Sequence, residues 1–206
     1  EEGEFYVKAL AYDKSPRKPQ WLHSFGTYPF RVLRTNLTTG VTAQFSDWGD
    51  YRPCDESTMS ELPHGQLYFT GGSLVEGEYG TFDWVVCFDS FKELARTEKP
   101  SMLTARCRHG AAFYGDYLYA IGGYHFPNYL TECERFDVYQ EKWEALEPLP
   151  HACSNTSVIV LEEPNCLFAL GGKAANEEID LIQRLNLGDL KWDVLELKLP
   201  NPFHKI

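Results

Sequence analysis

The sequence predicts an all-β repeat protein, and three observations support that prediction. Aromatic residues make up 15% of the 206 residues, and β-branched residues are also frequent; both kinds favour strands. We find no stretch of about 12 residues with the sustained 3.6-residue periodicity of an amphipathic helix. Glycine pairs begin at positions 71, 122 and 171, which are 51 and then 49 residues apart, and each pair follows a hydrophobic run. A fixed period near 50 residues indicates structural repeats.

The most regular copy of the repeat lies between Tyr117 and Trp143. Tyr117–Ile121 is an aromatic and β-branched run that predicts a strand. The pair Gly122-Gly123 closes this strand with a sharp bend, because only glycine takes a positive φ without penalty. Two further strands are expected after a polar loop, at Cys133–Asp137 and around Trp143. The copy therefore reads as a small antiparallel unit.

Two other positions recur with the glycine pairs. A hydrophobic residue followed by Asp or Asn comes after each pair, and Trp143 and Trp192 each stand 20 residues past the second glycine. A short polar side chain can bond its own backbone two residues on, which suits a turn between strands. The tryptophans should pack between neighbouring units. Structural roles are therefore predicted for Gly71, Gly72, Gly122, Gly123, Gly171, Gly172, Asp89, Asp137, Asn186, Trp143 and Trp192.

The repeat divides the chain into four segments. Residues 1–49 hold an N-terminal strand, Phe5–Leu10, and a degenerate first repeat that has no glycine pair but keeps a polar turn residue at Asn36. Three repeats with a glycine pair follow at residues 50–99, 100–150 and 151–206; the first of them has no closing Trp, and the last includes a C-terminal tail. We expect four similar units that depend on their neighbours for burial, since a single repeat cannot cover its own apolar faces.

These residues resemble the kelch repeats, a family in which each repeat forms one four-stranded blade of a β-propeller. The resemblance covers roughly residues 50 to 200, and its markers in the best copy are Arg106, Gly122, Gly123, Phe136 and Trp143. It implies a kelch-type β-propeller with about four blades at roughly 50 residues each, whereas propellers of this family usually have about five to seven.

This difference in blade number predicts an incomplete propeller, or one closed by another chain or a missing segment. Closed four-bladed propellers of the haemopexin type are the alternative, but they do not show this Gly-Gly pattern. An incomplete propeller leaves apolar blade faces uncovered. We therefore expect the isolated chain to self-associate, to aggregate or to need a partner chain that supplies the missing blades.

The composition excludes several classes of partner. The net charge is −11, with 30 acidic and 19 basic residues, and binding to nucleic acid needs clustered cations. No apolar run approaches the roughly 18 residues of a membrane-spanning helix, and the acidic start Glu1-Glu2-Gly3-Glu4 is unlike a signal peptide. We expect a cytoplasmic protein that binds neither nucleic acid nor membranes.

The sequence offers no catalytic motif. It contains no G-x-S-x-G, no H-E-x-x-H, no glycine-rich phosphate loop and no zinc spacing among its histidines. Cys107 and His109 could resemble a catalytic pair, but a turn or core pair is the commoner outcome. None of the six cysteines forms a C-x-x-C pair, which favours buried reduced thiols: Cys54, Cys87, Cys107, Cys133, Cys153 and Cys166. We therefore expect no catalysis, no cofactor and no metal.

The resemblance implies binding over the central channel. In kelch proteins that act as substrate receptors, partners touch the residue after each Gly pair and the start of each innermost strand. The first column here is Ser73, Tyr124 and Lys173; the second is Arg108, with Ser57 and Thr156 as looser alignments.

Arg108 is the most informative of these residues, because a guanidinium at a channel mouth can hold the carboxylate of an acidic peptide. The alternative, which applies also to Arg106, is a structural arginine that bonds neighbouring loop carbonyls.

The predicted function is a non-catalytic protein-binding module, a substrate receptor or scaffold that recognises a protein or peptide. It would accompany a cullin-recruiting or cytoskeletal domain outside these residues. The alternative is a propeller enzyme of oxidase or isomerase type, which one copper per chain would reveal.

Overall fold

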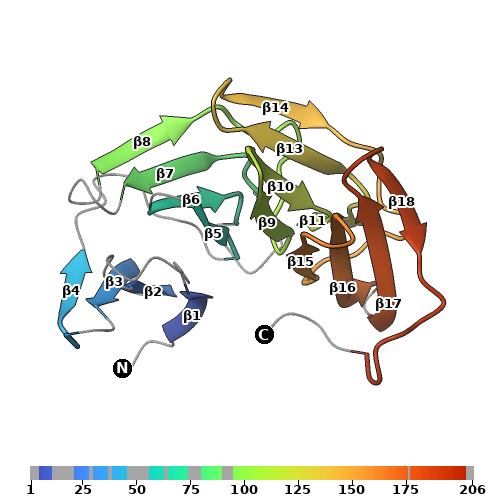
Figure 1. The fold of residues 1–206 in the computed structure, drawn as a ribbon, viewed down its shortest axis with the longest axis horizontal. Helices are drawn as coiled ribbons and strands as arrows, with labels where there is room; N and C mark the ends of the chain where they lie inside the picture. Colours follow the sequence, from blue (N-terminus) through green and yellow to red (C-terminus); the bar gives the residue numbers. More distant parts are fainter. Residues whose placement is uncertain are drawn as a thin grey trace.

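The computed structural model describes residues 5–10, 21–27, 30–36, 39–45, 56–62, 65–73, 80–89, 95–175 and 177–202. All regular elements among these residues are β-strands. They form four four-stranded antiparallel sheets and one short two-stranded sheet. Figure 1 shows the four large sheets as blades arranged in an arc around a common centre, with the first and last blades apart. The all-β prediction is confirmed, and the propeller is incomplete.

Each blade is a meander of four strands ordered from the centre outward. The first blade holds β1 (Phe5–Leu10), β2 (Trp21–Thr27), β3 (Phe30–Asn36) and β4 (Thr42–Phe45). The second blade holds β5 (Thr58–Leu62), β6 (Gln66–Thr70), β7 (Val85–Asp89) and β8 (Ala95–Lys99). The third blade holds β9 (Gly110–Tyr114), β10 (Tyr117–Ile121), β13 (Cys133–Asp137) and β14 (Lys142–Ala145), and its loop carries β11 (Tyr124–His125) and β12 (Asn128–Tyr129). The fourth blade holds β15 (Ser157–Leu161), β16 (Cys166–Ala174), β17 (Glu177–Asn186) and β18 (Lys191–Val194).

The innermost strands of successive blades are neighbours. β1 lies next to β5, β5 next to β9, and β9 next to β15, so these four strands line the middle of the arc (Figure 1). The four sheets overlap the four predicted segments in order, although the residue at which one segment passes into the next stays a prediction.

The Gly pairs of the second and third blades connect each of these blades to the next one. Gly122 and Gly123 have φ values of 58° and 111°, and a Cβ at Gly122 would stand 2.6 Å from the carbonyl oxygen of Cys153 in the following blade. The amide of Gly123 donates a hydrogen bond to that carbonyl at 2.8 Å, as Gly72 donates to Arg106 at 2.9 Å. The pairs are therefore needed for positive φ and for close approach between blades.

The fourth blade uses its Gly pair differently. Gly171 and Gly172 keep φ values of 58° and 115°, but they lie inside β16, where the pairing with β17 is irregular between Leu170 and Gly172. The strand thus continues through a bulge to Ala174.

The polar turn residues close the hairpins between the third and fourth strands of the blades. The carboxylate of Asp137 accepts hydrogen bonds from the amides of Tyr139 at 2.9 Å and Gln140 at 2.8 Å. Asn186 accepts from Gly188 at 2.8 Å, and Asn36 accepts from Thr39 at 3.0 Å. The turn after Asp89 lies outside the described residues.

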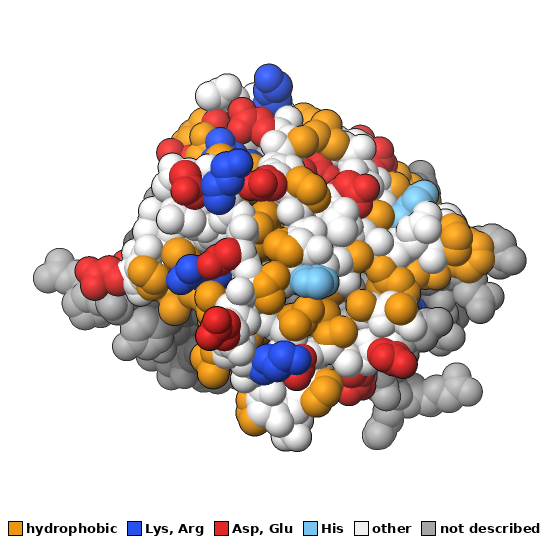
Figure 2. Space-filling model, turned by 90° about the vertical axis from the view of Figure 1, so that its right-hand side faces the viewer, with side chains coloured by type: hydrophobic (Ala, Val, Ile, Leu, Met, Phe, Trp, Pro, Cys, Tyr) orange, Lys and Arg blue, Asp and Glu red, His pale blue; other side chains and the backbone are white. Residues whose placement is uncertain are grey.

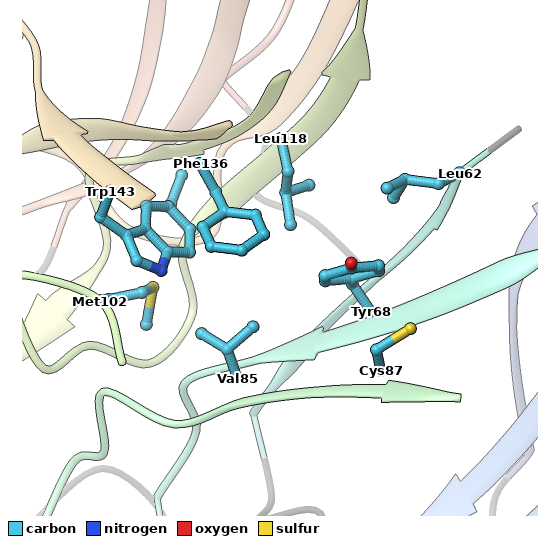
Figure 3. Packing of buried hydrophobic residues seen from close by; sticks show 9 residues of the cluster. Leu62, Tyr68, Val85, Cys87, Met102, Leu118, Phe136 and Trp143 are labelled. Atoms are coloured by element: carbon cyan, nitrogen blue, oxygen red, sulfur yellow. The ribbon is translucent and has the colours of Figure 1, made fainter. Parts of the chain in front are cut away.

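The core lies between blades rather than within them. One cluster joins Tyr68, Val85 and Met102 of the second blade and its connection to Leu118, Phe136 and Trp143 of the third, and Figure 3 shows these side chains pointing toward one another. The ring of Phe136 lies 5.2 Å from the ring of Trp143 and 6.1 Å from the ring of Tyr68. A second cluster joins the third and fourth blades in the same way. Each blade is therefore stabilised mainly by its neighbours.

Trp143 and Trp192 occupy equivalent positions in these two clusters. The indole of Trp143 donates to the carbonyl of Pro100 at 2.8 Å, and the indole of Trp192 donates to the carbonyl of Glu147 at 2.9 Å. Each acceptor follows the outermost strand of the preceding blade. Trp143 is only 5% exposed, whereas Trp192 is half-buried, so the two rings bury different amounts of apolar area.

Arg106 is a structural residue inside the connection between the second and third blades. Its guanidinium is buried and donates to the carbonyls of Gly122 and Glu132, both at 2.7 Å, and to the carboxylate of Glu134 at 2.6 Å. Glu134 also accepts from the amides of Leu103 at 2.7 Å and Thr104 at 3.2 Å. The guanidinium and the carboxylate are therefore both paired and hydrogen-bonded, as buried charges require.

The five described cysteines are free and buried: Cys87, Cys107, Cys133, Cys153 and Cys166. Burial raises the pKa of the Cys133 thiol to about 12 and that of Cys153 to about 11. Cys54 lies outside the described residues. None of the described segments forms a helix that could span a bilayer.

Candidate functional site at the channel mouth

The channel mouth is the end of the channel at which the innermost strands begin. Glu56, Arg108 and Asn155 each stand two residues before an innermost strand, namely β5, β9 and β15. All three have positive φ values, of 63°, 54° and 52°. We call these three residues the mouth row.

Backbone hydrogen bonds link the mouth row from blade to blade. The amide of Arg108 donates to the carbonyl of Glu56 at 3.1 Å, and the amide of Asn155 donates to the carbonyl of Arg108 at 2.7 Å. Asn takes a positive φ readily, but Glu and Arg do so at a cost. The fold therefore fixes the backbone of these three residues, and their side chains follow one another around the mouth from the second to the fourth blade.

The predicted second column needs a correction of one residue. Arg108 is aligned with Glu56 and Asn155, and not with Ser57 and Thr156, which come one position later. Both of these side chains are buried, and Thr156 donates to the carbonyl of Leu170 at 3.2 Å. Ser57 and Thr156 therefore support the wall of the mouth, and their role in partner binding stays a prediction.

The residues after the Gly pairs lie beside the mouth row. Tyr124 and Cys107 exchange two backbone hydrogen bonds, at 2.8 and 3.0 Å, and Lys173 and Ser154 exchange two at 2.7 and 2.9 Å. These bridges bring Tyr124 next to Arg108 and Lys173 next to Asn155. Ser73 forms its bridge with Thr81 instead, and its side chain is buried. The first predicted column thus meets the mouth row at two places, with Tyr124 beside Arg108 and Lys173 beside Asn155.

Arg108 is paired with Glu56 across the boundary between the second and third blades. Its Nε donates to Glu56 Oε1 at 2.7 Å, and its Nη2 contacts the same oxygen. Burial alone would lower the pKa of Arg108, but the hydrogen bonds and charge of Glu56 raise it, so the guanidinium stays charged. The other carboxylate oxygen of Glu56, Oε2, is buried without a hydrogen-bond partner. Arg108 is neither a lone cation nor a donor to loop carbonyls, because a carboxylate neutralises it.

An aromatic hairpin stands over this ion pair. β11 and β12 pair Tyr124 with Tyr129 and His125 with Asn128. The ring of Tyr124 lies 5.2 Å from the ring of Tyr129 and 6.5 Å from the ring of Phe126, and the guanidinium of Arg108 lies 6.0 Å from the centre of the Tyr124 ring. Phe126, at the tip of the hairpin, is 48% exposed. The hairpin therefore exposes the aromatic ring of Phe126 to solvent near the partly exposed Arg108.

The hairpin and the roles of Glu56 and Asn155 were not predicted from the sequence. A signal for the hairpin exists, because Pro127 and Asn128, two residue types common in turns, stand between aromatic residues. Nothing in the sequence marks Glu56 as a residue with positive φ.

The described residues hold no cluster of three or more His, Cys, Asp or Glu side chains placed to bind a metal. Cys107 is buried beside Glu56, and burial and that negative charge both raise the pKa of its thiol, which stays protonated. His109 is also buried and shares a hydrogen bond of 2.8 Å with Thr70. Cys107 and His109 are thus core residues at the base of the mouth.

Comparisons with known proteins found a matching motif in one blade and several relatives. A family model described as the Kelch motif matches residues 105–150. Kelch-like protein 25 of Xenopus tropicalis is 28% identical over 148 residues, which cover 67% of this chain and 24% of that protein. Kelch-like protein 33 of Homo sapiens is 35% identical over 112 residues, which cover 50% of this chain and 21% of that protein. Kelch repeat and BTB domain-containing protein 2 of cowpox virus (strain GRI-90 / Grishak) is 29% identical over 96 residues, which cover 47% of this chain and 17% of that protein.

The chain therefore spans between 17% and 24% of the length of these three relatives. The matched motif coincides with the third blade and includes its Gly pair, its polar turn and its tryptophan. The third blade thus matches the Kelch motif, and the relatives that the chain resembles are kelch-repeat proteins.

Proposed function

We propose that the chain is a non-catalytic protein-binding module, a substrate receptor or scaffold, that holds a protein or peptide at the channel mouth. The observation that carries this proposal is the group formed by Arg108, Tyr124 and exposed Phe126 on a hairpin fixed to the third blade. Tyr and Arg are enriched among the residues that dominate binding energy at protein interfaces. Loops held by a rigid scaffold are where such residues usually lie.

The charges at the mouth indicate which partner chemistry fits. Glu56 already neutralises Arg108, so an acidic group of a partner reaches Arg108 only by competing with Glu56. Lys173 brings a second cation to the mouth, with Glu178 directly opposite it in the pairing of β16 with β17, although the chain as a whole carries a net charge of −11. A segment that places an apolar side chain on Tyr124 and Phe126 and an acidic side chain near Lys173 would complement this surface.

The proposal includes a cytoplasmic location. The five described cysteines are buried free thiols, which suits a reducing compartment.

The proposal predicts that capture of partner proteins depends on the mouth. The immobilised chain is incubated with cell extract, and bound proteins are quantified by mass spectrometry for wild type, Arg108→Ala and Tyr124→Ala. Interface residues of this kind contribute about 2 kcal/mol or more, so capture of a true partner should fall at least about tenfold in both variants. The matched controls are Arg96→Ala, which removes an exposed arginine paired with Glu98 on β8, and Tyr139→Ala, which removes an exposed tyrosine at the β13–β14 turn.

Thermal melts separate binding from folding in this experiment. Arg108→Ala leaves Glu56 without its partner, so the double variant Glu56→Gln/Arg108→Gln, which removes both charges together, is tested beside it. If every mouth variant captures the same proteins as wild type, the proposed site is wrong. If Arg108→Ala unfolds several degrees early while the double variant melts and binds like wild type, Arg108 has only a structural role.

A further inference from the structure

Each arginine whose side chain the structure describes is paired with a carboxylate: Arg96, Arg106, Arg108, Arg135 and Arg184. The pairs of Arg96, Arg135 and Arg184 lie on the two outer strands of a single blade and are partly or fully open to solvent. Figure 2 shows similar pairing on the side of the molecule at which β18 lies, where basic side chains in blue lie next to acidic ones in red. The Arg108–Glu56 pair differs, because it joins two blades at the channel mouth.

Glu56 uses only part of the Arg108 guanidinium. A guanidinium carries five N–H donors. Donors on Nε and Nη2 both contact one oxygen, Glu56 Oε1, and Nη1 donates to no acceptor among the described residues. The side chain of Arg108 is 30% exposed. Its remaining donors can therefore reach an acceptor that a partner brings to the mouth.

The Glu56 carboxylate is a poorly screened negative charge. Only 19% of its side chain is exposed, and its Oε2 is buried without a hydrogen-bond partner among the described residues. Charges withdrawn from water interact more strongly than exposed ones. Burial and the charge of Glu56 both raise the pKa of the neighbouring Cys107 thiol. A partner carboxylate at Arg108 would meet the same charge, because it would share one guanidinium with Glu56.

An uncharged amide oxygen fits the remaining donors of Arg108 better than a carboxylate does. The Arg108–Glu56 pair is neutral as a whole, so it offers hydrogen bonds without a net attraction for an anion. An amide carbonyl accepts such bonds, whereas like charges placed together are strongly disfavoured at interfaces. The ring of Tyr124, 6.0 Å from the guanidinium, offers an apolar contact to the same partner segment.

We propose that Glu56 determines the specificity of the mouth: the Arg108–Glu56 pair accepts an uncharged amide oxygen of a partner segment and excludes a carboxylate at that point. This inference rests on the proposed binding at the mouth and names the partner chemistry that Arg108 takes. An acidic side chain of the partner then belongs near Lys173 on the fourth blade, and not at the boundary between the second and third blades.

Synthetic peptides in matched sets test this specificity. Peptides from a phage-displayed random library are selected on the wild-type chain, and those whose binding is lost in Tyr124→Ala are kept. Each position of a kept peptide is then made in turn as Gln, Ala and Glu, and affinities for the purified chain are measured by fluorescence polarisation. Glu56→Gln is compared with wild type. The control is Glu132→Gln, which removes an exposed carboxylate of the third blade and changes the net charge equally.

At one peptide position, the wild-type chain should bind the Gln form at least about tenfold more tightly than the Glu form, and Glu56→Gln should reduce this preference to about twofold or less. Glu132→Gln should keep the preference. It should also persist when the salt is raised from about 0.15 M to about 0.5 M, because buried charges are screened much less than exposed ones. Weaker binding of the Ala form than the Gln form would identify a side-chain amide as the acceptor, and equal binding would identify a backbone carbonyl.

Tighter binding of the Glu form by wild type would overturn the inference, because a carboxylate would then be the ligand of Arg108. An unchanged preference in Glu56→Gln, or an equal loss of preference in Glu132→Gln, would also overturn it, although the mouth would remain a binding site. If no selected peptide depends on Tyr124, the proposed site itself is wrong and the inference falls with it.

A second variant keeps the inference testable if thermal melts show that Glu56→Gln does not fold. The double variant Glu56→Gln/Arg108→Gln removes both charges of the pair, so it should bind the Gln and Glu forms within about twofold of each other. A preference of about tenfold for the Gln form in this double variant would overturn the inference.

Discussion

Replacing Trp143 by alanine should lower the free energy of unfolding by about 3 to 5 kcal/mol, the range for truncation of a large buried aromatic side chain. The ring is 5% exposed, packs 5.2 Å from the ring of Phe136 and donates to the carbonyl of Pro100 at 2.8 Å. The substitution opens a cavity between the second and third blades and leaves that carbonyl without its donor. Denaturant titration followed by circular dichroism measures the loss.

Trp192→Ala is the matched control for this prediction. Its indole makes the equivalent hydrogen bond, to Glu147 at 2.9 Å, but the ring is half-buried, so the loss should be smaller. A shift of less than a degree or two in the melting temperature of Trp143→Ala would show that the ring is exposed in solution and that the assigned repeat register is wrong.

Replacing Arg106 by methionine should cost about 3 to 5 kcal/mol, because removing one partner of a buried ion pair leaves an uncompensated buried charge. Both side chains of the Arg106–Glu134 pair are almost fully buried. Arg106 also donates hydrogen bonds to the carbonyls of Gly122 and Glu132. The substitution removes these bonds between the connection that carries Arg106 and the third blade. For a domain of this size, the melting temperature should fall by on the order of 10 °C.

Two variants test the cause of that loss. Arg184→Met removes an arginine whose bond to Asp193 is also 2.6 Å long but is exposed, and its melting temperature should stay nearly unchanged. Arg106→Met/Glu134→Met removes both buried charges and should recover part of the stability. If the double variant is no more stable than Arg106→Met, the loss comes from the missing carbonyl contacts and not from the stranded carboxylate.

The positions of the repeat that can be predicted from sequence are those at which the backbone conformation permits only one or two residue types. Gly122 and Gly123 hold φ values of 58° and 111° against the next blade, and few other residues could do so. Asp137 and Asn186 close turns that a short acceptor side chain suits. These requirements are local, so the same residue types recur in the sequence at a nearly fixed spacing.

The mouth is less predictable because its geometry comes from contacts distant in sequence. The pairing of Arg108 with Glu56 joins residues 52 positions apart. Glu56 has a positive φ, which cannot be predicted from a glutamate in the sequence. For this reason the predicted column was displaced to Ser57 and Thr156. The continuation of β16 through Gly171 and Gly172 was also not predicted. In the second and third blades the equivalent glycine pairs follow the end of a strand, so the sequence pattern suggested the same for the fourth blade.

Hydrogen exchange of the chain, free and bound to a partner whose capture depends on Arg108, tests the central claim most directly. If the chain binds proteins at the channel mouth, exchange should slow in peptides that cover residues 106–109, 122–129 and 153–156. Peptides from the outermost strands β8, β14 and β18 should be unaffected. Protection confined to those outer strands, with the mouth peptides exchanging as in the free chain, would contradict the claim.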